Sequence, residues 1–186
     1  MHTAFSGSPA GITAGSVFTT LLAVAAVSDL RTRRIPNELV ALLAVIGLIC
    51  AVLVAPGGFR NGVSGGVGVL VGFGLWLPFY LMGWLGAGDV KLFAASGAWL
   101  GPALTLDAAI TAALIGGLLA VVWMVRRDGV KNTAVTASLM ATAPRAVTMN
   151  GSDRRGAVPY GVALSIGVLL IALVQGGLFG VWHAAR

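Results

Sequence analysis

Residues 86–91 read Gly-Ala-Gly-Asp-Val-Lys and separate two long apolar stretches of the chain. They put an acid, Asp89, and a base, Lys91, beside two glycines that let the backbone take strained conformations. An ionisable group at membrane depth is costly unless it is paired, hydrated or functional. The segment is therefore a candidate functional site. The same letters also fit a turn with a helix-capping aspartate, so residues 86–91 alone leave both interpretations open.

The composition around this segment is typical of a membrane protein. Of the 186 residues, 58% are hydrophobic and only 10% are charged, whereas soluble domains are about 25% charged. The mean hydropathy is +0.94. The single cysteine, Cys50, lies in an apolar run and excludes an internal disulfide and a cysteine-based zinc site within one chain. We expect neither a metal nor another cofactor.

The apolar stretches predict an all-α integral membrane protein, a bundle of about six transmembrane helices in one domain over residues 1–186. The predicted spans are residues 11–28, 39–55, 62–85, 90–104, 106–125 and 160–182. The first span lacks the preceding Lys or Arg of a secretory signal, so we interpret it as a retained helix. The fourth is short for a hydrocarbon core about 30 Å thick. It either continues irregularly beyond residue 102 or begins below the membrane surface.

The basic residues predict the orientation of this bundle. Ten of the twelve lie in the loops 29–38, 85–91 and 126–158, which alternate spans bring to one side. They are Arg31, Arg33, Arg34, Lys91, Arg126, Arg127, Lys131, Arg145, Arg154 and Arg155. Only Arg60 and Arg186 lie on the other side. The positive-inside rule makes the first side cytoplasmic and puts both termini outside. The basic balance thus reflects topology and the lipid bilayer, and we expect no nucleic-acid partner.

This topology brings a second acid, Asp29, to the face that holds Asp89. Two adjacent carboxyl groups share a proton and titrate as a pair, so one can activate water while the other polarises a carbonyl. Which carboxyl group holds the proton stays open. A proton-coupled transporter that uses Asp29 and Asp89 as a relay is the alternative. Transporter sites usually lie near the bilayer midplane between repeats, and this sequence has no evident repeat.

Residues 29–37, Asp-Leu-Arg-Thr-Arg-Arg-Ile-Pro-Asn, together with residues 86–91, resemble the type IV prepilin peptidases. These are membrane aspartic endopeptidases of the GxGD class. The resemblance extends to Pro159-Tyr160-Gly161 at the start of the last span. It implies that Asp29 and Asp89 are the catalytic pair, which cleaves prepilin leader peptides on the cytoplasmic side of the plasma membrane. By the same resemblance, the residues that shape the site or contact the substrate are Gly86, Gly88, Lys91, Pro159, Tyr160 and Gly161.

Larger members of that family carry a methyltransferase region with paired cysteine motifs before the first span. This chain begins directly at the first span and has one cysteine. We therefore expect a short form that does not methylate the pilin. It is similar to the peptidases of tight-adherence (Flp-type) pilus systems.

Two further patterns predict how the helices pack together and where their ends meet the membrane interface. Small residues in the third span favour close helix packing in lipid, and they are Gly62, Gly65, Gly66, Gly68, Gly72 and Gly74. Tryptophans near span ends are typical of interfacial anchors, and they are Trp76, Trp84, Trp99, Trp123 and Trp182.

Overall fold

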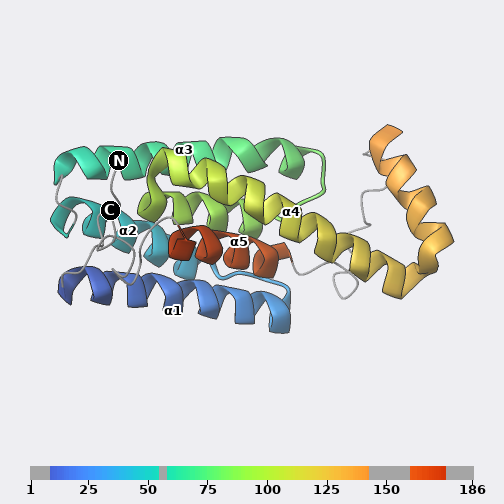
Figure 1. The fold of residues 1–186 in the computed structure, drawn as a ribbon, viewed down its shortest axis with the longest axis horizontal. Coiled ribbons are helices and arrows are strands. Elements are labelled where there is room, and N and C mark those ends of the chain that lie inside the picture. Colours follow the sequence, from blue (N-terminus) through green and yellow to red (C-terminus); the bar gives the residue numbers. More distant parts are fainter. Residues whose placement is uncertain (1–8, 55–57, 143–159, 175–186) are drawn as a thin grey trace.

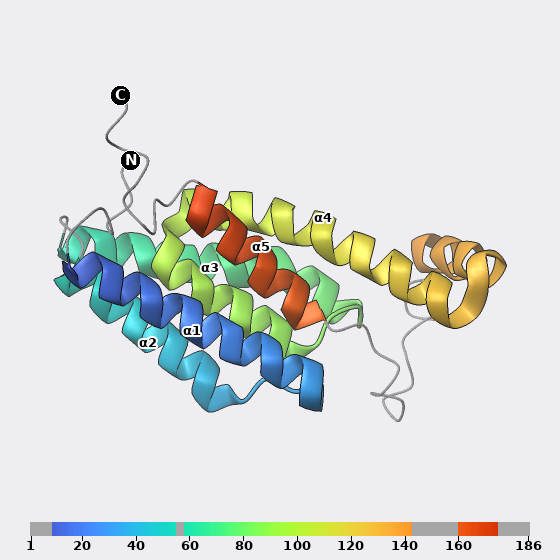
Figure 2. The same ribbon diagram turned by 60° about the horizontal axis from the view of Figure 1, so that its bottom comes forward.

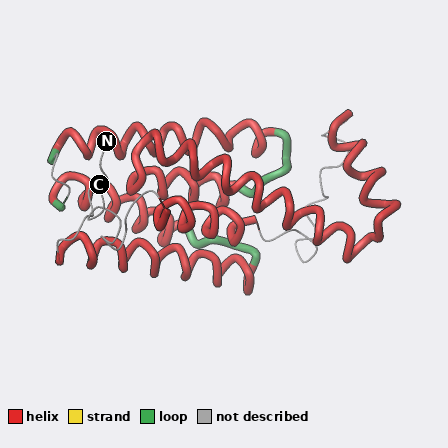
Figure 3. Tube along the Cα trace, viewed as in Figure 1, coloured by secondary structure: helices red, strands yellow, loops and turns green. Residues whose placement is uncertain are grey.

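The computed structural model describes residues 9–54, 58–142 and 160–174, and all of their regular secondary structure is α-helical (Figures 1 and 3). This confirms the predicted all-α class. The described helices are α1 (Pro9–Thr32), α2 (Asn37–Leu53), α3 (Phe59–Leu81), α4 (Ala87–Thr142) and α5 (Tyr160–Val174). The connectors drawn as loops in Figure 3 are short, so neighbouring helices run antiparallel.

Three stretches of the described chain are long and apolar enough to cross a membrane: Pro9–Thr32, Phe59–Leu81 and Ala87–Val122. Two shorter apolar helices accompany them, α2 with 17 residues and α5 with 15. Large apolar side chains also cover the outside of the bundle, such as Leu70, which is 71% exposed, and Phe59, which is 79% exposed. A lipid environment accounts for such a surface, because apolar side chains gain nothing by hiding from hydrocarbon.

Helix α4 doubles back on itself within the bundle (Figure 2). The reversal lies at Gly101, whose φ of 70° is outside the right-handed helical region, and Pro102 follows it. Residues 87–100 form a first arm, which packs antiparallel to α3. Residues 102–142 form a second arm; its first part packs antiparallel to α5, and its last part lies beyond the other helices and bends away (Figures 1 and 2). With α4 counted as two arms, the described helices provide six antiparallel segments. The sequence predicted two separate helices at these positions.

The first arm of α4 is the centre of the bundle. All eight residues from 92 to 99 are buried. Trp99 joins three helices there: its ring stacks on Phe18 of α1 at a centroid distance of 4.8 Å, and its indole N–H donates to the Leu43 carbonyl of α2 at 2.8 Å. Because the central arm is covered on every side, its position fixes that of Asp89 at its start.

Glycines bring α3 and the first arm into backbone contact. The backbones of Gly68 and Gly97 lie against each other, and a Cβ at Gly72 would lie 3.1 Å from the Ala94 Cα. The predicted close packing is therefore confirmed at Gly65, Gly68 and Gly72. It is also confirmed at Gly62, where a Cβ would meet the Val52 side chain of α2, and it is wrong at Gly66 and Gly74, which have open space beside them.

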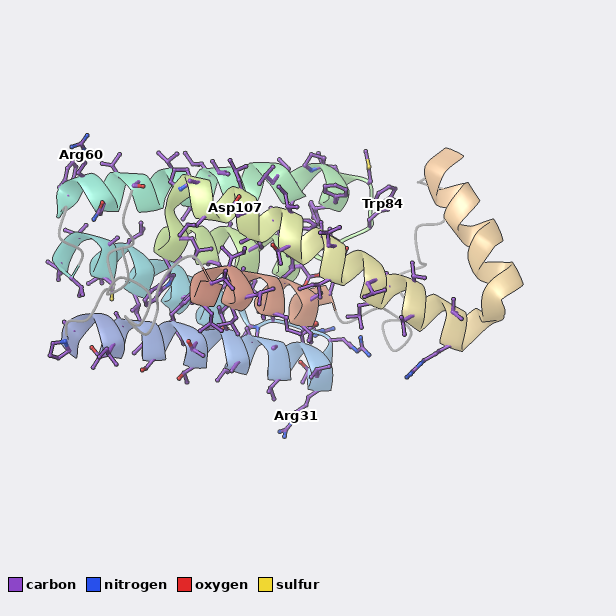
Figure 4. The ribbon with its side chains drawn as sticks, viewed as in Figure 1. Arg31, Arg60, Trp84 and Asp107 are labelled. Carbon is purple, nitrogen blue, oxygen red and sulfur yellow. The ribbon has the colours of Figure 1, made fainter. Side chains whose placement is uncertain are left out.

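The tryptophan prediction was wrong for Trp76 and Trp99, which are 4% and 8% exposed. Both lie in the interior, where they contact other aromatic rings. Trp84 is 44% exposed at one end of the bundle, as an interfacial residue would be (Figure 4). The side chains of Trp123 and Trp182 lie outside the described ones.

Several observed helix ends differ from the predicted spans. Helix α1 continues through Thr32, and α3 ends at Leu81, so the connectors are residues 33–36 and 82–86. The expected loop 126–158 is helical as far as Thr142, where the second arm of α4 extends past the other helices (Figure 1). The remainder of that loop, and residues 175–182 of the last predicted span, lie outside the described residues.

Candidate active site

One end of the bundle gathers both motifs. The connectors 33–36 and 82–86 lie there, together with the start of α4 and the start of α5 (Figure 2). Arg31 marks the same end of the bundle, and Arg60 lies at the opposite end (Figure 4). The two charged segments, residues 29–37 and 86–91, thus meet, although Asp29 and Asp89 are 60 positions apart in the sequence.

Asp29 lies in the last turn of α1 and is only 7% exposed. Its Oδ2 atom is buried without a hydrogen-bond partner among the described residues. The backbone N–H groups of Gly161 and Val162 face the carboxyl group from the first turn of α5. The first N–H groups of a helix have no partner within the helix and carry partial positive charge, so they suit a carboxylate.

The chain leaves α1 through a tightly held turn. Arg33 has a φ of 53°, and its N–H donates to the Asp29 carbonyl at 2.9 Å. The hydroxyl groups of Ser28 and Thr32 both donate to the Arg34 carbonyl, at 2.9 and 3.1 Å. The first bond satisfies a carbonyl in the last turn of α1, and the two hydroxyl groups fix the Arg34 carbonyl just beyond the helix. The turn therefore holds the next residue, Ile35, in a fixed position.

Ile35 contacts the site on two sides. A Cβ at Gly161 would lie 3.1 Å from the Ile35 Cδ1, and a Cβ at Gly88 would lie 3.5 Å from the Ile35 Cβ. Ile35 therefore packs between the glycine beside Asp29 and the glycine that precedes Asp89. A Cβ at Gly161 would press against Ile35, whereas a Cβ at Gly88 would make an ordinary van der Waals contact with it.

Asp89 lies in the first turn of α4 and is partly buried. The N–H of Gly86 donates to its Oδ2 atom at 3.2 Å, so the side chain reaches back to the residue before the helix, as the acid of a capping box does; the sequence interpretation had expected Asp89 to be the N-cap residue itself. Asp29 is close enough to act electrostatically on the Asp89 carboxyl group. The cap and the acid pair are therefore compatible features of the same residue.

The start of α5 closes this end of the bundle. Gly161 is buried, and a Cβ there would lie 2.9 Å from the Asp29 Oδ2. The ring of Tyr160 lies against Gly116 of α4 and is near enough to Asp89 for an electrostatic interaction. The resemblance expected Tyr160 and Gly161 near the acids, and they lie there. Pro159 lies outside the described residues.

Lys91 lies at the rim of the site. It is exposed, and its Nζ donates to the Asn37 Oδ1 at 3.3 Å. This bond joins the first turn of α4 to the first turn of α2, and so links the two sequence motifs. Among the predicted glycines, Gly88 packs on Ile35, whereas Gly86 is exposed and supplies the capping N–H.

Sequence reasoning missed two residues of this region: Ile35, which packs next to the acids, and Trp76, which contacts the ring of Tyr160. Ile35 belongs to the quoted motif, and its apolar character within a charged connector was a usable signal. Trp76 of α3 contacts Tyr160 with ring centroids 6.3 Å apart. Nothing in the sequence distinguishes it from the other tryptophans.

The arrangement is suited to proton-transfer chemistry. A buried carboxyl oxygen without a partner and a second carboxyl group nearby can share a proton and polarise a water or a carbonyl. Within the described part of the chain, no group of three or more His, Cys, Asp or Glu side chains is arranged to hold a metal ion. The carboxyl groups of Asp29 and Asp89 and the hydroxyl group of Tyr160 are near enough to interact electrostatically at this end of the bundle.

Comparison with known proteins identifies the family. The type IV leader peptidase family matches residues 16–121, which is more than half of the chain and includes both aspartates. A protein of Pectobacterium carotovorum subsp. carotovorum, described as a prepilin leader peptidase/N-methyltransferase, is 32% identical over 114 residues. The alignment covers 58% of this chain but only 40% of that relative. No solved structure matches the chain. The chain belongs to the type IV leader peptidase family.

Proposed function

We propose that this protein is a membrane aspartic endopeptidase that removes leader peptides from type IV prepilins, with Asp29 and Asp89 as its catalytic pair. The observation that carries the proposal is the buried, unpartnered Oδ2 of Asp29 beside Asp89 at one end of the bundle. Both aspartates fall within the range that the family matches. The relative from Pectobacterium supports prepilins as the substrate class.

The proposed reaction uses one shared proton and one water molecule. The ionised carboxyl group takes a proton from the water as its oxygen attacks the scissile carbonyl carbon. The other carboxyl group gives its proton to the carbonyl oxygen. The tetrahedral intermediate then breaks its C–N bond. The first carboxyl group gives the proton it took from water to the leaving nitrogen, the second takes a proton from a hydroxyl group of the intermediate, and the pair again holds one proton.

The proposed orientation follows from the charges. All six antiparallel segments cross the plasma membrane, the acid pair faces the cytoplasm, and both termini are outside. Arg31, Arg33 and Arg34 at the site end, against Arg60 at the other end, support this orientation. We further propose an Flp-type prepilin as the substrate.

The position of the acids favours a peptidase over a transporter. Asp29 and Asp89 lie at one end of the bundle, next to two connectors, whereas coupling sites of transporters usually lie near the midplane. A site at the end of the bundle can receive a peptide segment that emerges from the membrane.

Cleavage of a tagged prepilin from the same genome, co-expressed with this protein, tests the proposal. We expect Asp29→Asn and Asp89→Asn each to abolish leader removal on gels, because each leaves a single carboxyl group. Both variants should still accumulate in the membrane. The matched control is Asp107→Asn, because Asp107 lies on the second arm of α4, one or two turns after the reversal and far from the site. Normal processing by either site variant would remove the acid pair from the mechanism.

A further inference from the structure

Trp76 has a buried hydrogen-bond donor with nothing to bind. The residue is 4% exposed, and its Nε1 has no hydrogen-bond partner among the described residues. A buried indole N–H usually finds a partner, and Trp99 in the same bundle does, at the Leu43 carbonyl. An unpaired N–H is expensive at membrane depth, where no bulk water can replace the missing acceptor.

Two aromatic rings connect the unpaired donor to the proposed acid pair. The Trp76 ring meets Tyr160 edge-on at 6.3 Å and Phe93 edge-on at 5.5 Å. Tyr160 interacts with Asp89, and Phe93 lies one helical turn after Asp89 on the same side of α4. Trp76 is thus one layer of side chains deeper in the bundle than the acids.

The described residues hold only two buried side-chain polar atoms without a partner, and they are complementary. One is an acceptor, the Oδ2 of Asp29, and the other is a donor, the Nε1 of Trp76. Both atoms belong to residues that contact the first turn of α5, at Gly161 and Tyr160. A polar ligand that offers both donors and acceptors would satisfy this end of the bundle.

We propose that the Trp76 indole N–H donates a hydrogen bond to a backbone carbonyl of the prepilin segment bound across Asp29 and Asp89. This rests on the proposed function and adds a substrate-binding residue to it. An extended peptide carries a carbonyl at every residue, and each one needs a donor once it leaves water. Indole is a donor only, so a carbonyl is the group on a peptide backbone that it can bind.

The test compares a tryptophan-to-phenylalanine substitution at two positions of the purified full-length protein. The substrate is a prepilin encoded in the same genome. Trp76→Phe keeps an aromatic ring and removes the N–H. We expect kcat/KM to fall about tenfold, the size of one hydrogen bond, with most of the loss in KM and little change in the unfolding temperature. Trp99→Phe removes an N–H that already has a partner. It should lower the unfolding temperature and leave kcat/KM of the folded protein unchanged.

A second measurement identifies the substrate carbonyl that accepts the hydrogen bond from Trp76. In synthetic peptides that span the cleavage site, single amide bonds are replaced by esters, whose carbonyl is a weaker acceptor. One ester should reduce cleavage by the wild-type protein, and Trp76→Phe should show no further loss with that same peptide. If the losses from Trp76→Phe and from every ester simply add, the proposed bond is absent.

The outcomes separate this inference from the proposed function. Wild-type kcat and KM for Trp76→Phe, with Asp29→Asn inactive in the same assay, would overturn the role of Trp76 alone. An active Asp29→Asn variant would overturn the proposed function itself. A lower unfolding temperature for Trp76→Phe without any change in KM would make Trp76 a packing residue and also overturn the inference.

Discussion

Gly161 lets the first turn of α5 approach the carboxyl group of Asp29. A Cβ at this position would lie 2.9 Å from the Oδ2 atom and 3.1 Å from the Ile35 Cδ1. Gly161→Ala should therefore displace Asp29, Ile35 or the start of α5. A shift of about 1 Å in a catalytic group can cost about 100-fold in rate, so we expect a loss of that size in kcat. The measurement is cleavage of the prepilin by purified protein.

Gly117→Ala is the matched control for Gly161→Ala. Gly117 is also a helical glycine, but a Cβ there meets nothing within 4 Å. Alanine within a helix is about 0.5–1 kcal/mol more favourable than glycine, so this variant should be active and slightly more stable. Full activity of Gly161→Ala would mean that catalysis by Asp29 does not depend on the close approach of the first turn of α5.

The acids were easier to predict than their neighbours. Only six residues of the chain are acidic, and the alternation of spans brings Asp29 and Asp89 to one end. Trp76 could not be assigned in the same way. In a soluble helix, polar residues reveal the outer face, but in lipid both faces are apolar, so the sequence does not tell a buried tryptophan from an interfacial one.

The reversal of α4 depends on a glycine that no other residue replaces without strain. Gly101 has a φ of 70°, which costs about 1–2 kcal/mol for a residue with a Cβ, and a Cβ there would also lie 3.0 Å from the Ser64 Oγ. Gly101→Ala should lower the free energy of unfolding by about this amount. Thermal unfolding in detergent measures the change.

Gly66→Ala is the comparison for Gly101→Ala, because Gly66 is a helical glycine of α3 with open space beside it. It should leave the unfolding temperature unchanged or raise it slightly. The folded fraction of Gly101→Ala should still cleave prepilin, since Gly101 lies at the end of the bundle away from Asp29. An unfolding temperature equal to that of Gly66→Ala would contradict a strained reversal.

At the level of elements, the sequence predicted the breaks better than the helix ends. Pro36 and the Gly101-Pro102 pair were readable, because proline cannot continue a helix and glycine tolerates positive φ. The helix ends at Thr32 and Leu81 could not be read from the sequence, because hydrogen bonds of side-chain hydroxyl groups and of the backbone determine where these helices stop. Ser28 and Thr32 bind the Arg34 carbonyl only after the turn has formed.

For the whole molecule, the proposed orientation predicts which end of the bundle reaches the cytoplasm. Single cysteines report this in a Cys50→Ala background that still cleaves prepilin. Glu38→Cys is at the site end, and Phe59→Cys, where the native side chain is 79% exposed, is at the other. In intact spheroplasts, a membrane-impermeant maleimide should label only Phe59→Cys.

Lysis of the spheroplasts provides the control, because both cysteines should then react. Labelling of Glu38→Cys before lysis would reverse the orientation and put the acid pair outside the cell. Equal labelling of both cysteines before lysis would mean that the helices between them do not cross the membrane as proposed.

The burial of Asp29 by α5 has a consequence for biosynthesis. A nascent chain is made from its N-terminus, so Asp29 and Asp89 enter the membrane while the residues that face them from α5 do not yet exist. A ribosome that stalls before residue 160 releases a product with both carboxyl groups but without Gly161 and the N–H groups beside it. Completion of the site is thereby tied to completion of the helices, and an unfinished chain is kept from being a finished peptidase.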